Sequence, residues 1–347
     1  MQIINTALCS YGMSGSIFHA PFLHLHKGFE LYGVWERTKK TACHKYPRIK
    51  SFDTYEDLLK GGDIDLVIVN TPNYTHFDFA KKALLSGKNI IVEKPFCITV
   101  KECDELIALA KEKNKLLSVY QNRRYDSDFK IIRNIVHENL LGDLVEVEFH
   151  FDRFKEELSP KGHKEIPGPG TGLLYDLGSH LIDQALCLFG KPQSIFADIA
   201  AARKISLVDD YMELILFYPS LRVRIKASYV VREPLPSYIL HGTKGSFIKT
   251  RTDVQETALQ SGLTPDAKDW GTEPENERGL LHTERAGKVI REYLPSENGN
   301  YMEYYNGIYQ ALTEGADLPV SAEAGRNVIE IIEKAYQSNH EKKIIEI

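Results

Sequence analysis

Apolar and polar positions alternate along the first 125 residues in blocks that predict strands and helices in turn. Short, almost wholly apolar runs at 65–70 and 89–92 are rich in β-branched residues, which is typical of strands buried on both faces of a parallel sheet. Further strands are expected at 3–9, 29–35 and 116–120, and amphipathic helices at 75–86 and 99–114. This alternation predicts an α/β fold with a doubly wound parallel sheet.

The pattern changes after about residue 140, where strand-like runs follow one another. They lie at 145–154, 195–201, 211–218, 223–231 and 238–249. Two of them alternate apolar and polar residues around Pro219-Ser220, which predicts an antiparallel hairpin with one solvated face. Helices are expected at 173–189, 300–314 and 322–338, whereas the polar stretch 251–296 is expected to form loops. We therefore predict two domains, 1–125 and 126–347.

Composition narrows the class of partner. The chain has 347 residues with a formal net charge of −5, so nucleic acid and anionic membranes are poor candidates. No apolar run is long enough to span a bilayer, and the first residues form an expected strand rather than a signal peptide. Five scattered cysteines without a C-x-x-C pair fit buried thiols in a reducing cytoplasm.

A glycine turn follows the first expected strand. It reads Ser10-Tyr11-Gly12-Met13-Ser14-Gly15, so it carries the second and third glycines of the G-x-G-x-x-G fingerprint and has Ser10 in place of the first. In this position the glycines allow a tight turn and close approach of a pyrophosphate, and the following helix offers its N-terminus to the phosphates. The turn predicts a dinucleotide site that includes Ser10, Gly12, Met13 and Gly15.

The second expected strand ends in Glu36. An acidic residue at this point accepts hydrogen bonds from the adenosine ribose and disfavours a 2′-phosphate. Arg37 and Thr38 follow at once, with two lysines after them, and these residues suit a 2′-phosphate. The two indications conflict, and NAD and NADP both stay open as the cofactor.

Three later strand ends carry polar side chains. Ligands bind at the carboxyl ends of strands in a doubly wound sheet, so these residues are candidates for the site. A lysine directly after a buried strand can polarise a substrate oxygen, although pairing with a nearby carboxylate is an alternative. The three groups are Asn70-Thr71-Pro72-Asn73 with His76, Glu93-Lys94-Pro95, and Gln121-Asn122-Arg123-Arg124.

The run 173–184 places Asp176, His180 and Asp183 on an apolar helix. Asp176 and His180 are four residues apart and can meet on one helical face. A carboxylate beside an imidazole controls its tautomer and basicity, which suits proton transfer, although such pairs also occur as structural contacts. No metal site is predicted, because His19, His24 and His26 have no matching cluster of acidic ligands.

Together these motifs resemble the Gfo/Idh/MocA family of NAD(P)-dependent oxidoreductases over essentially the whole chain. The resemblance rests on the glycine turn, Thr71-Pro72 with His76, Glu93-Lys94-Pro95, the run ending at Asp183, and Leu318-Pro319-Val320-Ser321. The closest subgroup is that of the scyllo-inositol dehydrogenases, on Phe18-His19-Ala20-Pro21 and the segments 120–124 and 174–180. The family resemblance implies an N-terminal Rossmann domain and a C-terminal α/β domain with a large, open, mostly antiparallel sheet.

The resemblance also implies a reaction. The family's catalytic lysine falls on Lys94, its carboxylate on Asp176 and its histidine on His180, with substrate contacts expected from Tyr120, Asn122, Arg123 and Asp183. The reaction expected is hydride transfer between NAD or NADP and a secondary alcohol on a sugar or an inositol-like cyclitol. A cofactor-recycling enzyme that cleaves glycosides or eliminates groups, and a non-catalytic ligand sensor, are the alternatives. A cytoplasmic homodimer or homotetramer is expected.

Overall fold

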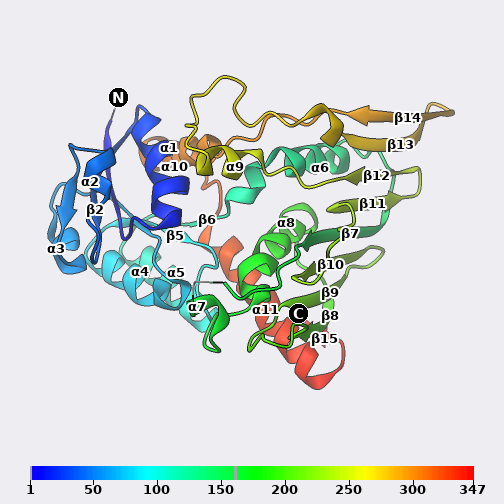
Figure 1. Ribbon diagram of the computed structural model, residues 1–347, viewed down its shortest axis with the longest axis horizontal. Helices are drawn as coiled ribbons and strands as arrows, with labels where there is room; N and C mark the ends of the chain where they lie inside the picture. Colours follow the sequence, from blue (N-terminus) through cyan, green and yellow to red (C-terminus); the bar gives the residue numbers. More distant parts are fainter. Residues whose placement is uncertain (1, 160–161) are drawn as a thin grey trace. The chain divides into compact units, whose positions relative to one another are not determined.

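The chain divides into two units that interleave along the sequence (Figure 1). The structure is a computed structural model that describes residues 2–159 and 162–347, so residues 1, 160 and 161 of the two predicted domains lie outside it. The first unit contains segments 1–125, 255–270 and 300–326, and the second contains 126–254, 271–299 and 327–347.

The first unit is built on a six-stranded sheet in which every pair of neighbouring strands is parallel. This order of strands is that of dinucleotide-binding doubly wound sheets and confirms the predicted fold. β4 is apolar and buried along its whole length, and the three central residues of β5 are apolar and buried, as their sequences predict. In spatial order the strands are β3 (Lys50–Phe52), β2 (Phe29–Trp35), β1 (Ile4–Leu8), β4 (Leu66–Val69), β5 (Asn89–Glu93) and β6 (Leu117–Tyr120).

Helices connect these strands and carry local signals that the sequence predicts. Thr99 and Glu102 form the expected capping box, and Gly87 has φ 73° just after α4. The described α-helices that lie wholly in this unit are α1 (Ala20–Leu25), α2 (Ala42–Lys45), α3 (Tyr55–Lys60), α4 (His76–Leu85), α5 (Val100–Glu112) and α10 (Met302–Glu314).

The second unit is built on a nine-stranded sheet in which only β7 and β10 pair in parallel. The mostly antiparallel sheet is the one expected, and Phe217 pairs with Arg222 across the predicted Pro219-Ser220 turn. In spatial order the strands are β14 (Lys288–Leu294), β13 (Gly279–Arg285), β12 (Gly245–Lys249), β11 (Tyr238–Gly242), β7 (Leu144–Asp152), β10 (Arg222–Ser228), β9 (Tyr211–Phe217), β8 (Ser194–Ala200) and β15 (Ile345–Glu346).

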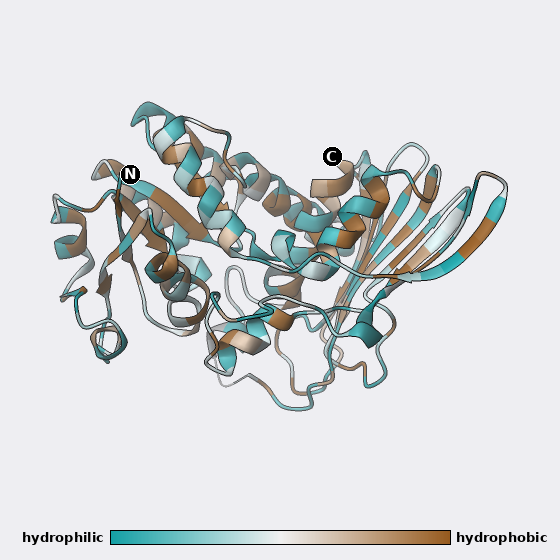
Figure 2. Ribbon diagram, turned by 90° about the horizontal axis from the view of Figure 1, so that it is seen from above, coloured by the Kyte–Doolittle hydropathy of each residue, from teal (hydrophilic) through white to brown (hydrophobic). Residues whose placement is uncertain are grey.

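One face of this sheet is apolar and the other is mixed. Burial alternates along β9 and β10, and Figure 2 shows hydrophobic and hydrophilic residues alternating along the strands. The helix α8 (Ser179–Phe189) packs against β7, β10 and α6 (Ser127–His137). α7 (Gly162–Glu165) and α11 (Ala322–Glu341) complete the helices of this part of the chain.

The prediction of loops over 251–296 is wrong. The stretch contains α9 (Val254–Gln260) and the hairpin β13–β14. β14 is largely exposed, so its sequence lacks the apolar alternation that identifies a half-buried strand. The hairpin turns at Ala286-Gly287, where both residues have positive φ, as two-residue hairpin loops require, and alanine is an unusual residue there.

Candidate active site

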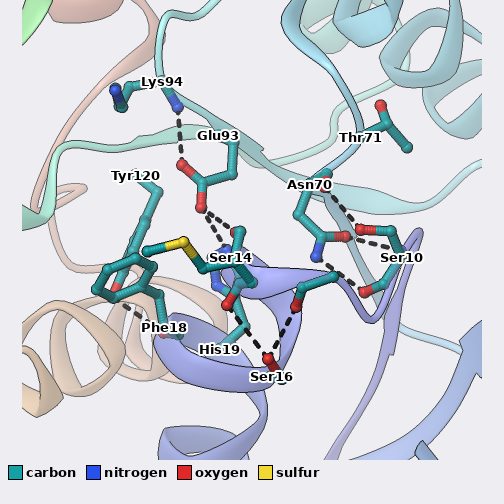
Figure 3. A network of polar contacts seen from close by, with 12 residues as sticks. Ser10, Ser14, Ser16, Phe18, His19, Asn70, Thr71, Glu93, Lys94 and Tyr120 are labelled. Atoms are coloured by element: carbon teal, nitrogen blue, oxygen red, sulfur yellow. Dashed lines mark hydrogen bonds and ion pairs between the residues drawn. The ribbon is translucent and has the colours of Figure 1, made fainter. Parts of the chain in front are cut away.

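The glycine turn after β1 is tied to the end of β4 by reciprocal hydrogen bonds (Figure 3). The backbone N–H of Ser10 donates to Asn70 Oδ1 over 2.9 Å, and the Asn70 amide donates back to Ser10 O over 2.9 Å. The Ser10 hydroxyl donates to Asn70 O over 2.8 Å. Ser10 therefore replaces the first fingerprint glycine without loss of the turn, because its side chain closes the turn onto β4.

The two glycines that remain are needed for different reasons. A Cβ at Gly15 would lie 2.3 Å from Ser10 O, so this residue allows helix and strand to pack closely. A Cβ at Gly12 would meet nothing within 4 Å and would project into open space. A pyrophosphate needs this open approach to the backbone, so the turn fits a dinucleotide. The turn leads into a π-helix, Ser14–His19, an element often found at functional sites.

A buried histidine, His76, holds the segment Thr71-Pro72-Asn73 that follows β4. His76 Nε2 lies 2.9 Å from Thr71 O and Nδ1 lies 2.9 Å from Pro95 O. Thr71 Oγ1 lies 2.7 Å from Thr75 Oγ1. Both ring nitrogens of His76 contact the protein's own backbone, so its contribution to a cofactor site is to hold Thr71-Pro72-Asn73 and the turn after β5 in place. Burial lowers the pKa of His76 despite these hydrogen bonds.

Glu93 and Lys94 end β5 and point in different directions (Figure 3). The Glu93 carboxylate accepts hydrogen bonds from the Ser14 hydroxyl, from His19 Nε2 over 2.9 Å and from the Lys94 backbone N–H over 3.1 Å. The Lys94 side chain extends away from Glu93 and is partly exposed. The lysine is thus fixed at its backbone by the residue that precedes it.

Glu36 at the end of β2 is a capping residue for the start of α2. Its Oε1 accepts from the Thr41 N–H and hydroxyl, each over 2.9 Å, and its Oε2 accepts from the Ala42 N–H over 2.8 Å. Both carboxylate oxygens are therefore engaged within the loop. Arg37 and Thr38 in the same loop are exposed.

The polar residues expected to contact substrate after β6 are all buried. The Tyr120 hydroxyl donates to Phe18 O over 3.0 Å, and the Arg123 guanidinium donates to Glu256 Oε2 over 2.8 Å. Asn122 is 5% exposed. These contacts give Tyr120 and Arg123 defined structural tasks within the first unit, which the sequence alone does not reveal.

In the second unit, Asp176 lies in a π-helix, Leu174–Gly178, that continues as α8. Asp176 Oδ2 accepts a hydrogen bond from Lys164 Nζ over 2.7 Å. His180 and Asp183 lie on α8 and are 6% and 2% exposed. The run is helical as expected, but its first turn is wider than an α-helix, and the direct contact of Asp176 with His180 stays a prediction.

Asp209 fixes the beginning of this helix. Its backbone O accepts from the Leu173 N–H over 2.8 Å, and its Oδ2 accepts from the Leu174 N–H over 2.8 Å. Gly172 has φ 98°, and a Cβ there would lie 2.0 Å from Asp209 Oδ1. Burial raises the pKa of Asp209, although hydrogen bonds from Leu174 and Tyr336 oppose the rise. The glycine before the Asp176 run is therefore required by the close approach of Asp209.

Family models match both parts of the chain. The oxidoreductase family's NAD-binding Rossmann fold matches residues 4–121, and its C-terminal alpha/beta domain matches residues 133–347. The chain belongs to the Gfo/Idh/MocA family of oxidoreductases. It is accordingly an NAD(P)-dependent oxidoreductase.

Relatives and solved structures within the Gfo/Idh/MocA family resemble the chain over its full length. It is 37% identical to scyllo-inositol 2-dehydrogenase (NADP(+)) IolW of Bacillus subtilis, covering 99% of this chain and 96% of that protein. It is 36% identical to the uncharacterized oxidoreductase YdgJ of Escherichia coli, covering 96% of each. A crystal structure assigned to an oxidoreductase from Bacteroides fragilis has 46% identity and a TM-score of 0.92, covering 100% of both chains.

Three residues that sequence reasoning did not place in the site contact its expected members. Ser14 and His19 bind Glu93, and Lys164 binds Asp176. His19 lies in Phe18-His19-Ala20-Pro21, one of the segments that carry the resemblance to the Gfo/Idh/MocA subgroup. This segment is the sequence feature that could have pointed to His19. Among the side chains that the structure describes, no cluster of three His, Cys, Asp or Glu residues is arranged to hold a metal ion, and no described helix has the length and apolarity to cross a membrane.

Proposed function

We propose that the chain is an NADP-dependent dehydrogenase that interconverts a secondary alcohol and a ketone on a sugar or an inositol-like cyclitol. The observation that carries this proposal is the 37% identity to IolW over 99% of the chain. The family resemblance adds Lys94, Asp176 and His180 as the proposed catalytic residues. The bound cofactor supplies the chemistry of hydride transfer at its nicotinamide ring.

Each of the three residues has a distinct task in this proposal. His180 takes the hydroxyl proton of the alcohol as general base during oxidation and returns it during reduction. Asp176 orients His180 or binds a neighbouring hydroxyl. Lys94 donates a hydrogen bond to the reacting oxygen and stabilises the developing alkoxide charge. Asn122 and Asp183 remain candidates for further contacts with the substrate hydroxyls.

The cofactor would be held by the first unit. Ser10, Gly12, Met13 and Gly15 form the turn that meets the pyrophosphate, and backbone N–H groups at the start of the following helix face it. Thr71, Pro72 and Asn73 would lie beside the nicotinamide half of the cofactor, and His76 would hold that segment in place. Glu93 would contribute by positioning its partners Ser14, His19 and Lys94.

The preference for NADP is supported by the state of Glu36. An acidic residue discriminates against NADP when its carboxylate binds the ribose hydroxyls. Here both oxygens already accept hydrogen bonds from Thr41 and Ala42. Arg37 is exposed beside this loop and offers a planar guanidinium for the 2′-phosphate. IolW carries NADP(+) in its name, which points the same way.

The proposal is tested by turnover of NAD(H) and NADP(H) with inositol isomers and aldoses, followed at the nicotinamide absorbance. We expect turnover of a polyol with NADP and a large loss in Lys94→Met, which should still bind cofactor. Arg37→Ala should weaken NADP binding and leave NAD binding unchanged, whereas Arg48→Ala, at an exposed arginine of the first unit, serves as the control. Substrate consumption without net release of reduced cofactor would contradict the dehydrogenase proposal and indicate a cofactor-recycling enzyme instead.

We also propose a cytoplasmic homodimer or homotetramer. The mixed face of the nine-stranded sheet carries ion pairs between strands, such as Arg224 with Glu148 at 2.6 Å and with Glu213 at 3.3 Å. All five cysteines are free thiols, of which Cys187 is exposed, and this suits a reducing compartment. Light scattering coupled to size-exclusion chromatography measures the oligomer, and a monomeric mass at micromolar concentration would contradict it.

A further inference from the structure

We call the π-helix Ser14–His19, which follows the glycine turn, the cofactor helix. A fully buried histidine at its end, His19, links this helix to the end of β5, next to Lys94 (Figure 3). His19 is the last residue of the π-helix that follows the glycine turn, and its side chain is 0% exposed. Its Nε2 lies 2.9 Å from Glu93 Oε1, and its Nδ1 lies 2.7 Å from the Tyr305 hydroxyl. The ring also packs against Tyr120, with ring centroids 4.6 Å apart.

The two ring nitrogens of His19 have different partners. Nδ1 lies 2.7 Å from the Tyr305 hydroxyl, which donates to Phe18 O over 2.8 Å. The Glu93 carboxylate accepts from Nε2. His19 therefore contacts a carboxylate through one ring nitrogen and a phenol hydroxyl through the other.

Burial by itself would raise the pKa of Glu93. The hydrogen bond and charge of His19, the hydrogen bond from Ser14 and the charge of Lys94 outweigh burial and hold the pKa of this carboxyl below its usual range. A buried charge is retained only where it is paired and hydrogen-bonded. His19 is therefore the partner that allows Glu93 to stay ionised beside the glycine turn.

Glu93 uses its two oxygens for different parts of the site. Oε1 accepts from Ser14 and His19, at the two ends of the π-helix, whereas Oε2 accepts from the Lys94 backbone N–H. The carboxylate thus joins the cofactor helix to the backbone of the lysine. Any movement of Glu93 changes where the Lys94 side chain begins.

We propose that His19 is a positioning residue for Lys94, acting through Glu93, and that it couples the cofactor helix to the placement of the lysine. This proposal rests on the role proposed above for Lys94. It assigns separate tasks to the two ring nitrogens: Nε2 sets the position of Glu93, and Nδ1 anchors the ring to Tyr305.

The two tasks are separated by a matched pair of substitutions. An asparagine amide reaches about as far as Nδ1 and a glutamine amide about as far as Nε2, so His19→Asn keeps the contact with Tyr305 and His19→Gln keeps a donor to Glu93. We expect kcat to fall about 10²-fold in His19→Asn, as small misplacements of reacting groups do, and to fall much less in His19→Gln. His24→Asn, at an exposed position of α1, the helix that follows directly, is the control and should leave kcat unchanged.

A second readout does not need turnover. The Lys94 amide is protected by Glu93, so hydrogen exchange of this amide in the cofactor-free protein should speed up in His19→Asn and in Glu93→Gln and stay slow in His19→Gln and His24→Asn. Glu93→Gln added to His19→Asn should cost little more in kcat than either change alone, because both act on the same contact.

The outcomes separate this proposal from the proposed function. Equal losses of kcat in His19→Asn and His19→Gln, or losses that multiply in His19→Asn/Glu93→Gln, would overturn the positioning role. Unchanged Lys94 amide exchange in His19→Asn would overturn it as well. Absence of polyol turnover in the wild-type protein, with the expected exchange pattern intact, would instead reject the proposed function and leave the coupling of His19 to the Lys94 backbone supported.

Discussion

Lys164 donates a hydrogen bond from its ammonium to Oδ2 of Asp176 over 2.7 Å. The segment that carries Lys164 is anchored at the next residue, where Glu165 accepts from the Ser159 N–H over 2.7 Å and lies 3.4 Å from Arg203. Arg203 is in turn 2.8 Å from Asp210. A cation is thereby held beside Asp176, the carboxylate proposed above to act with His180.

Replacing Lys164 with methionine should therefore impair catalysis more than stability. Asp176 would lose a charge-assisted hydrogen bond that fixes its orientation, so we expect kcat/KM to fall roughly tenfold, about 1.4 kcal/mol. Lys164→Arg should retain most of the activity. Steady-state kinetics measure the effect, with Lys204→Met, at an exposed position of the same unit, as the control. Equal activity of Lys164→Met and Lys204→Met would count against a role for the Lys164 contact.

The two fingerprint glycines should respond differently to alanine. A Cβ at Gly12 meets nothing within 4 Å, so Gly12→Ala should fold normally and lose cofactor affinity at least about tenfold, because the pyrophosphate approaches there. A Cβ at Gly15 would lie 2.3 Å from Ser10 O, so Gly15→Ala should lower the free energy of unfolding by about 1–3 kcal/mol. Urea unfolding and cofactor titration separate the two effects, and a destabilised Gly12→Ala with normal affinity would contradict this assignment.

The sequence predicts those elements that carry a clear local pattern of apolar or capping residues. β4 and β5 are apolar and β-branched because both their faces are covered, and α5 has its capping box at Thr99 and Glu102. β14 could not be found in this way because most of its side chains are exposed, so packing imposes no apolar period on it. The three-residue strand β3 is too short to show any period.

The sequence supplies candidate residues for the site but not the contacts that those residues make. Glu36 follows a strand in the position of a ribose-binding acid, but whether its carboxylate is available depends on the backbone of Thr41 and Ala42, which only the folded loop decides. His19 contacts Glu93, which is 74 residues away along the chain. Such long-range pairs have no local pattern in a single sequence.

His150 should make stability depend on pH. Nε2 lies 2.8 Å from Glu148, and Nδ1 lies 3.5 Å from Asp152. Burial lowers the pKa of His150, but the nearby carboxylates of Asp152 and Glu148 outweigh it and raise the pKa above 6.5, while Lys226 on the paired strand and Arg224 add positive charge nearby. Because the folded-state pKa is raised, the stabilisation is complete below the unfolded value of about 6.5 and is lost as pH rises through the folded value.

Urea unfolding of the wild-type protein and His150→Gln at several pH values measures this contribution. The wild-type protein should lose more unfolding free energy than the variant between about pH 6 and pH 9, since only the wild-type protein releases this proton. Parallel pH profiles for the two proteins would show that His150 does not bind its proton more tightly in the folded state. His137→Gln, at the end of α6, is a matched control.

Arg123 should act on stability rather than on substrate affinity. Its guanidinium donates to Glu256 of α9 over 2.8 Å, and the side chains are 6% and 18% exposed. Breaking a buried ion pair from one side leaves an uncompensated charge, so Arg123→Leu should cost about 3 kcal/mol of unfolding free energy, and the double variant with Glu256→Leu should recover part of it. A substrate contact predicts the opposite pattern, with a raised KM in Arg123→Leu that Glu256→Leu does not relieve. Denaturant unfolding and steady-state kinetics on the four proteins of this cycle decide between the two roles.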